Sequence, residues 1–478
     1  MNTEVKSTQK VIPIIPQDAE PEVISLYAAH EKIYPRSVSG FFSRWRWAMV
    51  VLTQLVFYGV PWLEWGQRQA ILFDLGTKRF YIFGLVLYPQ DFIYLTGILV
   101  ISALSLFLFT AVAGRLWCGY ACPQTVYTEI FLWIEKKVEG DRAARIRRDG
   151  QPLSLEKVGR KALKHFLWLA VALWTGFTFV GYFTPIKVLG MEFVQMSMSS
   201  WEVFWTFFYG FATYGNAGFM REQVCKYMCP YARFQSAMFD KDTLIVTYDA
   251  ERGDPRGARS KKADPAALNL GSCVDCNLCV QVCPTGIDIR KGLQYECIGC
   301  GACADVCDTV MDKMGYAPGL VKYTTENAMK NKWTTAQTWR HVFRPRILIY
   351  TTVLLGIVIA MLVSLTMRTP FKVNVVRDRG VMARVVEGGR IENVYQLQVM
   401  NATESDQHYK ITVEGLPGLV VASESVVMVE STQARRLAVR VQAPYEAAAP
   451  GTHPIEFEIE SLDFAGHLSE KSMFMVPR

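Results

Sequence analysis

The run CVDCNLCVQVCP, from Cys273 to Pro284, decides which domain the middle of the chain forms. Its four cysteines follow one another at intervals of three, three and four residues, and a proline comes directly after the last of them. A second run, CIGCGACADVC from Cys297 to Cys307, repeats these intervals, with Asp308 in place of the proline. The two runs hold eight of the twelve cysteines in the chain.

This spacing is typical of bacterial ferredoxins, in which the fourth cysteine of each run binds the cluster of the other run. It predicts two [4Fe–4S] clusters, and Gly299 and Gly301 allow the backbone to turn past the sulfurs. Zinc is the alternative for any Cys-x2-Cys pair, but eight cysteines in this order favour iron–sulfur. The predicted ligands are Cys273, Cys276, Cys279 and Cys307 for one cluster and Cys283, Cys297, Cys300 and Cys303 for the other.

The other four cysteines form two shorter motifs, each after an apolar segment. Cys118 and Cys122 lie in GRLWCGYACPQTVY, and Cys225 and Cys229 lie in EQVCKYMCPYAR. If the preceding segments continue as helices, each pair lies one turn apart on one face, and the following proline ends or kinks the helix. Four thiolates suit Cu(I) or another thiolate-bound metal centre. The alternative is that these cysteines are small buried residues that pack helices together.

The chain combines membrane and soluble segments. It has 478 residues, of which 51% are hydrophobic and 20% are charged. An apolar run of about 20 residues is long enough to span a bilayer, and a shorter run at 80–88 is predicted to be an interfacial strand or re-entrant piece. We also expect no signal peptide before the first apolar run. The five predicted spans are 47–63, 92–114, 166–184, 201–220 and 347–367.

The distribution of basic residues orients these spans. Lys and Arg are concentrated in 115–165 and are sparse in 64–91 and 185–200, so the positive-inside rule places 115–165 in the cytoplasm. A nucleic-acid-binding role for this basic segment is disfavoured, since no nucleic-acid fold signature accompanies it. The predicted order is a cytoplasmic segment 1–46, a membrane domain 47–248, a cytoplasmic linker and ferredoxin-like domain 249–346, a fifth span 347–367 and an external domain 368–478.

This topology also bears on the chemistry of the cysteines. All twelve lie between Cys118 and Cys307, on the predicted cytoplasmic side, where thiols are kept reduced. Metal or redox use is therefore favoured over disulfides. A transmembrane haem is disfavoured because no histidine lies inside a predicted span, and no glycine-rich nucleotide motif is present.

The external domain changes character from helix to strand. Segments such as NVYQLQVMNAT and HPIEFEIESL alternate or cluster β-branched and other apolar residues between turn signals. Strands repeated in this way over about 100 residues predict a β-sandwich of immunoglobulin type. The fold class is thus a multi-domain membrane protein: a helical bundle of about five spans, an inserted two-cluster ferredoxin-like domain and a C-terminal immunoglobulin-like β-sandwich.

The combination of motifs resembles the CcoG (FixG, RdxA) family of cytochrome c oxidase accessory proteins of bacterial membranes. GRLWCGYACPQTVYTEIF, CKYMCPYARFQSAMFD and YECIGCGACADVCD are similar to the family's own sequences. The resemblance implies reduction of Cu(II) to Cu(I) for the copper centre of a cbb3-type oxidase, in the bacterial inner membrane. It implies a copper-handling or redox role, and hence a catalytic and metal-binding one, for Cys118, Cys122, Cys225 and Cys229.

The same resemblance implies membrane lipid, the oxidase assembly machinery and copper-delivery proteins as partners. A cytoplasmic electron donor is also required, and the sequence does not identify it. A homodimer is an alternative to a monomer. Two other functions remain: a quinol-linked electron conduit to a respiratory partner, and a non-catalytic scaffold for oxidase assembly. Copper is expected as substrate or ligand, beside the two [4Fe–4S] clusters as cofactors.

The topology can be tested with enzyme fusions. An alkaline phosphatase fused after Arg478 is expected to be active, because it folds only when exported, whereas a fusion within 250–265 is expected to be inactive. Activities of the two fusions in whole cells check this expectation. The reverse pattern would move the cysteine-rich domain to the outside of the membrane.

Overall fold

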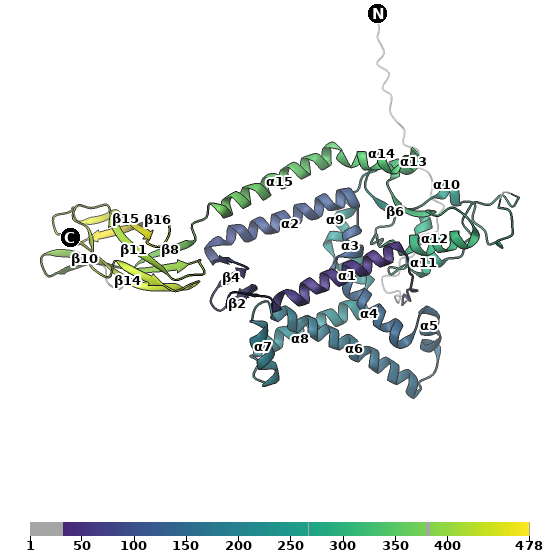
Figure 1. Cartoon of the computed structure of the whole chain (residues 1–478), viewed down its shortest axis with the longest axis horizontal. Coiled ribbons are helices and arrows are strands. Elements are labelled where there is room, and N and C mark those ends of the chain that lie inside the picture. Colours follow the sequence, from purple (N-terminus) through teal and green to yellow (C-terminus); the bar gives the residue numbers. More distant parts are fainter. Residues whose placement is uncertain (1–31, 266, 379–382, 478) are drawn as a thin grey trace, which may run out of the picture.

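The structure is a computed structural model that describes residues 32–265, 267–378 and 383–477. Most of the predicted N-terminal segment 1–46 therefore lies outside the described residues. Figure 1 shows a layer of long helices with the cysteine-rich domain at one end and the C-terminal β-sandwich at the other. The helices thus separate the two soluble parts of the chain.

Three helices are long and apolar enough to cross a membrane. They are α2 (Phe92–Ala113, with one preceding 3-10 turn), α6 (Leu155–Val180) and α15 (Pro345–Thr366). The other two predicted spans are also helical, as α1 (Phe41–Gly59) and α8 (Ser200–Gly215), but α8 has only 16 residues and neither is among the three. The number of five spans stays a prediction.

The long helices pack in close pairs. A Cβ on Gly97 of α2 would lie 2.9 Å from the Met361 sulfur of α15, so these two helices are in direct contact. A Cβ on Gly176 of α6 would clash with the carbonyl oxygen of Thr206 in α8 and lie 2.9 Å from the Gly210 nitrogen. Small residues that allow such backbone approach are typical of helix interfaces in membranes.

Helix α6 begins eleven residues before the predicted span 166–184. Ser154 caps it by accepting a hydrogen bond of 3.2 Å from the Lys157 backbone. Its first turns are largely exposed, but Lys164 is buried against α4 (Pro123–Glu139), where it lies 3.2 Å from Glu139 and 3.9 Å from Glu135. The predicted span therefore marks the apolar part of a longer helix, whose N-terminal part carries charges that are paired within the protein.

The cysteine-rich domain is closed by a short sheet. Strand β6 (Ile245–Tyr248) pairs antiparallel with β7 (Val321–Thr324), and both cysteine runs lie between them in sequence. The domain also contains α11 (Leu278–Gln281) and α12 (Ala302–Met314). The predicted linker 249–265 forms only one short helix, α10 (Ala250–Gly253).

The C-terminal domain is a β-sandwich, as predicted. One sheet has the order β12-β14-β10-β8 with β9 paired to β10, and the other has the order β13-β11-β15-β16. Phe371, Tyr395, Tyr409, Phe457 and Phe474 are fully buried between them. The strands are β8 (Phe371–Arg377), β9 (Arg384–Val386), β10 (Arg390–Asn401), β11 (Gln407–Glu414), β12 (Val420–Val421), β13 (Val426–Val429), β14 (Ala434–Pro444), β15 (Gly451–Ser461) and β16 (His467–Val476).

The segment 80–88 forms strands, as predicted. It contributes β4 (Arg79–Ile82) and β5 (Leu85–Leu87), which join β3 (Ile71–Asp74) in a three-stranded antiparallel sheet. This sheet packs on the β-sandwich through a shared cluster of buried residues. The cluster contains Leu72, Tyr81, Val86, Tyr88, Met400 and Ala402.

A buried ion pair holds this contact. Asp91, which precedes α2, is 3% exposed, and its carboxylate accepts a hydrogen bond of 2.6 Å from Arg368 at the end of α15. Lys372 of β8 lies 3.4 Å from the other carboxylate oxygen. The Tyr88 hydroxyl donates to the carbonyl of Asn401 at 2.8 Å. The β-sandwich is therefore attached to the helices by charge as well as by apolar contact.

Replacing Arg368 with Met should weaken this attachment by about 3 kcal/mol, because breaking a buried pair leaves an uncompensated carboxylate. Thermal unfolding and limited proteolysis of the purified full chain measure the loss. Arg436→Met, at an exposed position on β14, is the matched control. Equal stability of the two variants would show that the Asp91 pair does not hold the domain.

Candidate functional site

The eight ferredoxin-type cysteines surround two neighbouring cavities. One cavity is lined by Cys273, Cys276, Cys279 and Cys307, together with Tyr248, Leu278 and Met311 among others. The other is lined by Cys283, Cys297, Cys300 and Cys303, and Cys279 reaches it as well. The structure thus brings together the cysteines of each predicted set, including Cys307, which is distant in sequence from its partners. That they bind iron stays a prediction.

The cysteine cavities suit a cluster better than a single ion. Across residues 32–265, 267–378 and 383–477, no three His, Cys, Asp or Glu side chains converge closely enough to hold one metal ion. Structural zinc requires such convergence. In a [4Fe–4S] cubane each cysteine binds a different iron, so the sulfurs lie farther apart. The four-cysteine donor set of each cavity therefore fits an iron–sulfur cluster.

The loops around these cavities need left-handed backbone. Asn277, Gly299 and Gly301 have φ values of 54°, 63° and 73°. Glycine adopts such values without strain, and asparagine adopts them more often than most other residues do. Burial raises the pKa of Cys307 and Cys297 to about 12 and that of Cys279 to about 11. The free thiols are consequently protonated at neutral pH, and cluster binding must displace those protons.

The first shorter motif is not one continuous helix. Helix α2 ends at Gly114, whose φ is 55°, and Cys118 lies in the separate short helix α3 (Leu116–Tyr120). Cys122 is the N-cap of α4, with Pro123 at its first helical position. The prediction that Cys118 and Cys122 lie one turn apart on one helical face is therefore wrong. Proline fixes φ and lacks an N–H, so it starts a new helix here.

The second motif repeats this arrangement with π-helical turns. Helix α8 continues into η3 (Asn216–Met220), the chain turns at Arg221, and Cys225 lies in η4 (Val224–Met228). Cys229 then caps α9 (Pro230–Met238), with Pro230 at the first helical position. In both motifs the first cysteine lies in a short helical turn and the second lies at a helix N-terminus.

The two motifs meet. We call Cys118, Cys122, Cys225 and Cys229 the paired site, because every pair among their thiols is close enough to interact electrostatically. Burial raises the pKa of Cys118 to about 11 and that of Cys225 to about 12. Gln235 of α9 donates a hydrogen bond of 3.4 Å to the Cys118 sulfur. The predicted approach of the two motifs is present in the structure.

The paired site packs directly on the ferredoxin-like domain. A Cβ on Gly119 would lie 2.8 Å from the carbonyl oxygen of Ile298 and 2.9 Å from the Cα of Cys300. Cys118 and Cys225 pack against a buried cluster that contains Cys300. The loop 298–300 therefore lies between the paired site and the second cysteine cavity.

Two charged residues at this junction were not predicted from the sequence. Arg115 is 7% exposed and donates to the carbonyl oxygens of Ala232 at 2.6 Å and Cys297 at 3.5 Å. Asp305 of α12 accepts from the backbone of Phe42 at 3.1 Å and of Ser43 at 2.7 Å, at the start of α1. Both lie within the quoted cysteine motifs, but the cysteine spacing does not involve them, so only the folded contacts reveal their partners.

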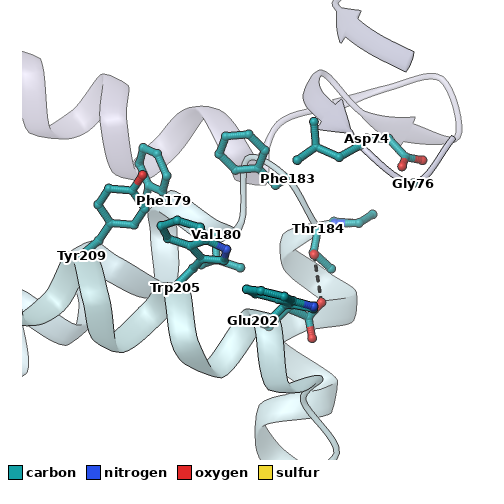
Figure 2. A pocket seen from close by; sticks show the side chains of 12 residues that line it. Asp74, Gly76, Phe179, Val180, Phe183, Thr184, Glu202, Trp205 and Tyr209 are labelled. Carbon is teal, nitrogen blue, oxygen red and sulfur yellow. Dashed lines mark hydrogen bonds between the residues drawn. The ribbon is translucent and has the colours of Figure 1, made fainter. Parts of the chain in front are cut away.

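A separate cavity of about 760 Å³ lies between the other ends of α6 and α8 and the β3–β4 turn. Figure 2 shows aromatic side chains along it, including Phe179, Trp205 and Tyr209, with Glu202 beside Thr184. The Thr184 hydroxyl donates a hydrogen bond of 2.9 Å to the Glu202 carboxylate. Among the described residues, no cysteine lines the cavity, and from Tyr209, its lining residue nearest in sequence to the second motif, the helix runs about 16 Å to Met220.

Three known families match parts of the chain. Residues 220–326 match a family described as a 4Fe-4S dicluster domain. Residues 95–139 match a 4Fe-4S binding domain. Residues 361–477 match the IG-like fold at the C-terminal of FixG. The chain is therefore an iron–sulfur protein with an immunoglobulin-like domain.

Three curated proteins are similar over most of the chain. The nitrogen fixation protein FixG of Rhizobium meliloti is 38% identical over 82% of this chain and 81% of its own. Protein RdxB of Cereibacter sphaeroides is 40% identical over 91% and 92%, and protein RdxA of the same organism is 38% identical over 82% and 84%. The crystal structure of a FixG-related protein from Vibrio parahaemolyticus matches only 23% of this chain and 97% of its own, with 24% identity and a TM-score of 0.21. The similarity to the three curated proteins shows that the chain belongs to the FixG/RdxA/RdxB family.

Proposed function

We propose that this chain carries electrons from a cytoplasmic donor to Cu(II), and that the Cu(I) formed serves the copper centre of a cbb3-type cytochrome c oxidase. The observation that carries the proposal is the contact between the paired site and the loop of Cys300. It supports an electron path from the ferredoxin-like domain to the membrane boundary. The copper part rests on the family resemblance and on the soft thiolates of the paired site.

The proposal assigns a role to each set of cysteines. Clusters bound by the eight ferredoxin-type cysteines would each accept and release one electron. Buried apolar side chains such as Val306 and Ile298 exclude water from the contact between the paired site and the second cysteine cavity. We further propose that α1 and α8 cross the membrane with the three longer helices, which places the cysteine-rich end in the cytoplasm and the β-sandwich outside.

The copper reaction balances with one electron. Each Cu(II) takes one electron that originates from a reduced flavin or iron–sulfur donor on the cytoplasmic side, and no proton or bond is transferred. Thiolate sulfur favours the product, because Cu(I) is the softer ion. The paired site is the proposed place from which copper receives the electron.

The two rival functions have less support. A quinol-linked conduit needs a site for the quinol ring near the redox centres. The aromatic cavity around Glu202 has no cysteine in its described lining, and its nearest lining residue on α8, Tyr209, lies about 16 Å of helix before Met220. A pure assembly scaffold has no need for a third four-thiol group packed against the ferredoxin-like domain. Each of the two rival functions predicts that the protein does not reduce copper, unlike the proposed function.

A single-turnover assay tests the proposal. The purified protein is reduced with dithionite, freed of excess reductant and mixed anaerobically with Cu(II) and a Cu(I)-specific chelator. We expect Cu(I) in proportion to the electrons stored. The double variant Cys118→Ala/Cys122→Ala should form less Cu(I), by roughly tenfold or more. A loss of this size is typical when residues that support a metal site are replaced.

Ser260→Ala, at an exposed position of the linker, is the control and should match the wild type. Cys276→Ser should lower the stored electrons and the Cu(I) together. Full Cu(I) formation in the double variant would leave the four cysteines as packing residues. No Cu(I) from reduced wild type would favour the scaffold, and reoxidation by quinone instead of Cu(II) would favour the conduit.

A further inference from the structure

The twelve cysteines form three groups of four, and the third group is the paired site. We propose that the paired site holds a third [4Fe–4S] cluster, with one iron bound by each of Cys118, Cys122, Cys225 and Cys229. This inference rests on the proposed function, since it specifies what the thiolates at the end of the electron path bind. Copper would then receive its electron from this cluster and would not replace it.

The first argument is geometric. The four thiols of the paired site lie close enough to interact with one another, yet no three of them converge on a single-ion site within the described residues. The two ferredoxin-type sets have the same property around their cavities. A single ion held by three or four thiolates would need those sulfurs close to one centre, whereas a cubane accepts four sulfurs that are spread around it.

The second argument is the local chain geometry. In each motif a cysteine precedes a proline at the start of a helix, as Cys122 and Cys229 do. Residues 95–139, which match a 4Fe-4S binding domain, contain only two cysteines, Cys118 and Cys122. A cluster with four protein ligands needs two more, and Cys225 and Cys229 are the cysteines that face this pair.

The third argument is electrostatic. Arg115 is buried beside the paired site, and its hydrogen bonds go to carbonyl oxygens. No carboxylate of the described residues forms an ion pair with it, and its Nε has no hydrogen-bond partner there. A buried cation without a counter-ion is costly. Four thiolates around a [4Fe–4S] core carry net negative charge, which this guanidinium would neutralise.

The site also has a suitable position for a relay. Gly119, between the two cysteines of the first motif, touches the loop of Cys300 without room for a side chain. One electron would enter the third cluster from the neighbouring ferredoxin-type cluster, and one electron would leave it to reduce Cu(II) to Cu(I). No atom is transferred, so the balance requires only the cytoplasmic reductant already named.

Iron and acid-labile sulfide, measured on anaerobically purified full-length protein, test the proposal directly. Three clusters predict about 12 iron atoms and about 12 sulfides per chain, against about 8 of each for two clusters. Cys118→Ser and Cys225→Ser should each lose about 4 iron atoms, because either change removes a ligand of the same cluster. Cys276→Ser is the matched control for the loss of a ferredoxin-type cluster, and Cys118→Ser/Cys276→Ser should lose about 8.

Spectroscopy separates cluster loss from misfolding. In Cys118→Ser, the EPR signals of the reduced ferredoxin-type clusters should persist while the total spin count falls by about one third. Arg115→Met should shift the midpoint potential of the third cluster to a more negative value, because the cation stabilises the reduced state, and Arg115→Lys should largely restore it.

Other outcomes would overturn the proposal. A wild type with about 8 iron atoms, and unchanged iron in Cys118→Ser and Cys225→Ser, would exclude a third cluster. Copper that co-purifies with the wild type and disappears in both variants would assign the paired site to copper. Neither result would by itself contradict Cu(II) reduction, which the single-turnover assay measures separately.

Discussion

The membrane part and the ferredoxin-like part of this chain meet where there is no room for a side chain. A Cβ on Gly119 would lie within 3 Å of three backbone atoms of the loop at 298–300, and a Cβ on Gly299 would lie 3.2 Å from the backbone of Arg115. Each loop therefore requires glycine where it touches the other. Because Cys118 and Cys300 flank this contact, the packing that joins the two domains also sets the distance between two groups of thiols.

Charged groups support this junction from both sides. Asp305 fixes the start of α1 to α12, and Arg115 reaches the carbonyl of Cys297. Glu135 is bound by Arg145 at 2.6 Å and Arg221 at 2.7 Å, which ties the chain before the second motif to α4. Burial alone would raise the pKa of Glu135, but its basic neighbours hold that pKa below the ordinary value. These pairs keep the short helices of the two motifs in place.

The sequence predicted features that depend on residues close together in the chain. It did not predict features that depend on contacts between residues far apart in the chain. The intervals between cysteines grouped all eight ferredoxin-type residues as they surround the two cavities, and strand alternation predicted the β-sandwich. Hydropathy marked only the apolar part of α6, because the charged Lys164 before it is paired with glutamates of another helix. The helical face expected for Cys118 and Cys122 was wrong because Pro123 begins a new helix. Arg115 stands three residues before Cys118 in the first motif, but only the folded structure reveals its contacts with the carbonyls of Ala232 and Cys297.

The central claim is that three groups of four cysteines hold three iron–sulfur clusters in adjacent positions, from the soluble domain to the membrane boundary. Anomalous scattering from crystals of the anaerobic protein, recorded at the iron and copper absorption edges, locates each metal without reference to activity. The account predicts three iron peaks, one in each cysteine group, with the third between Cys118 and Cys225. Two iron peaks, with copper or no metal at the paired site, would contradict it.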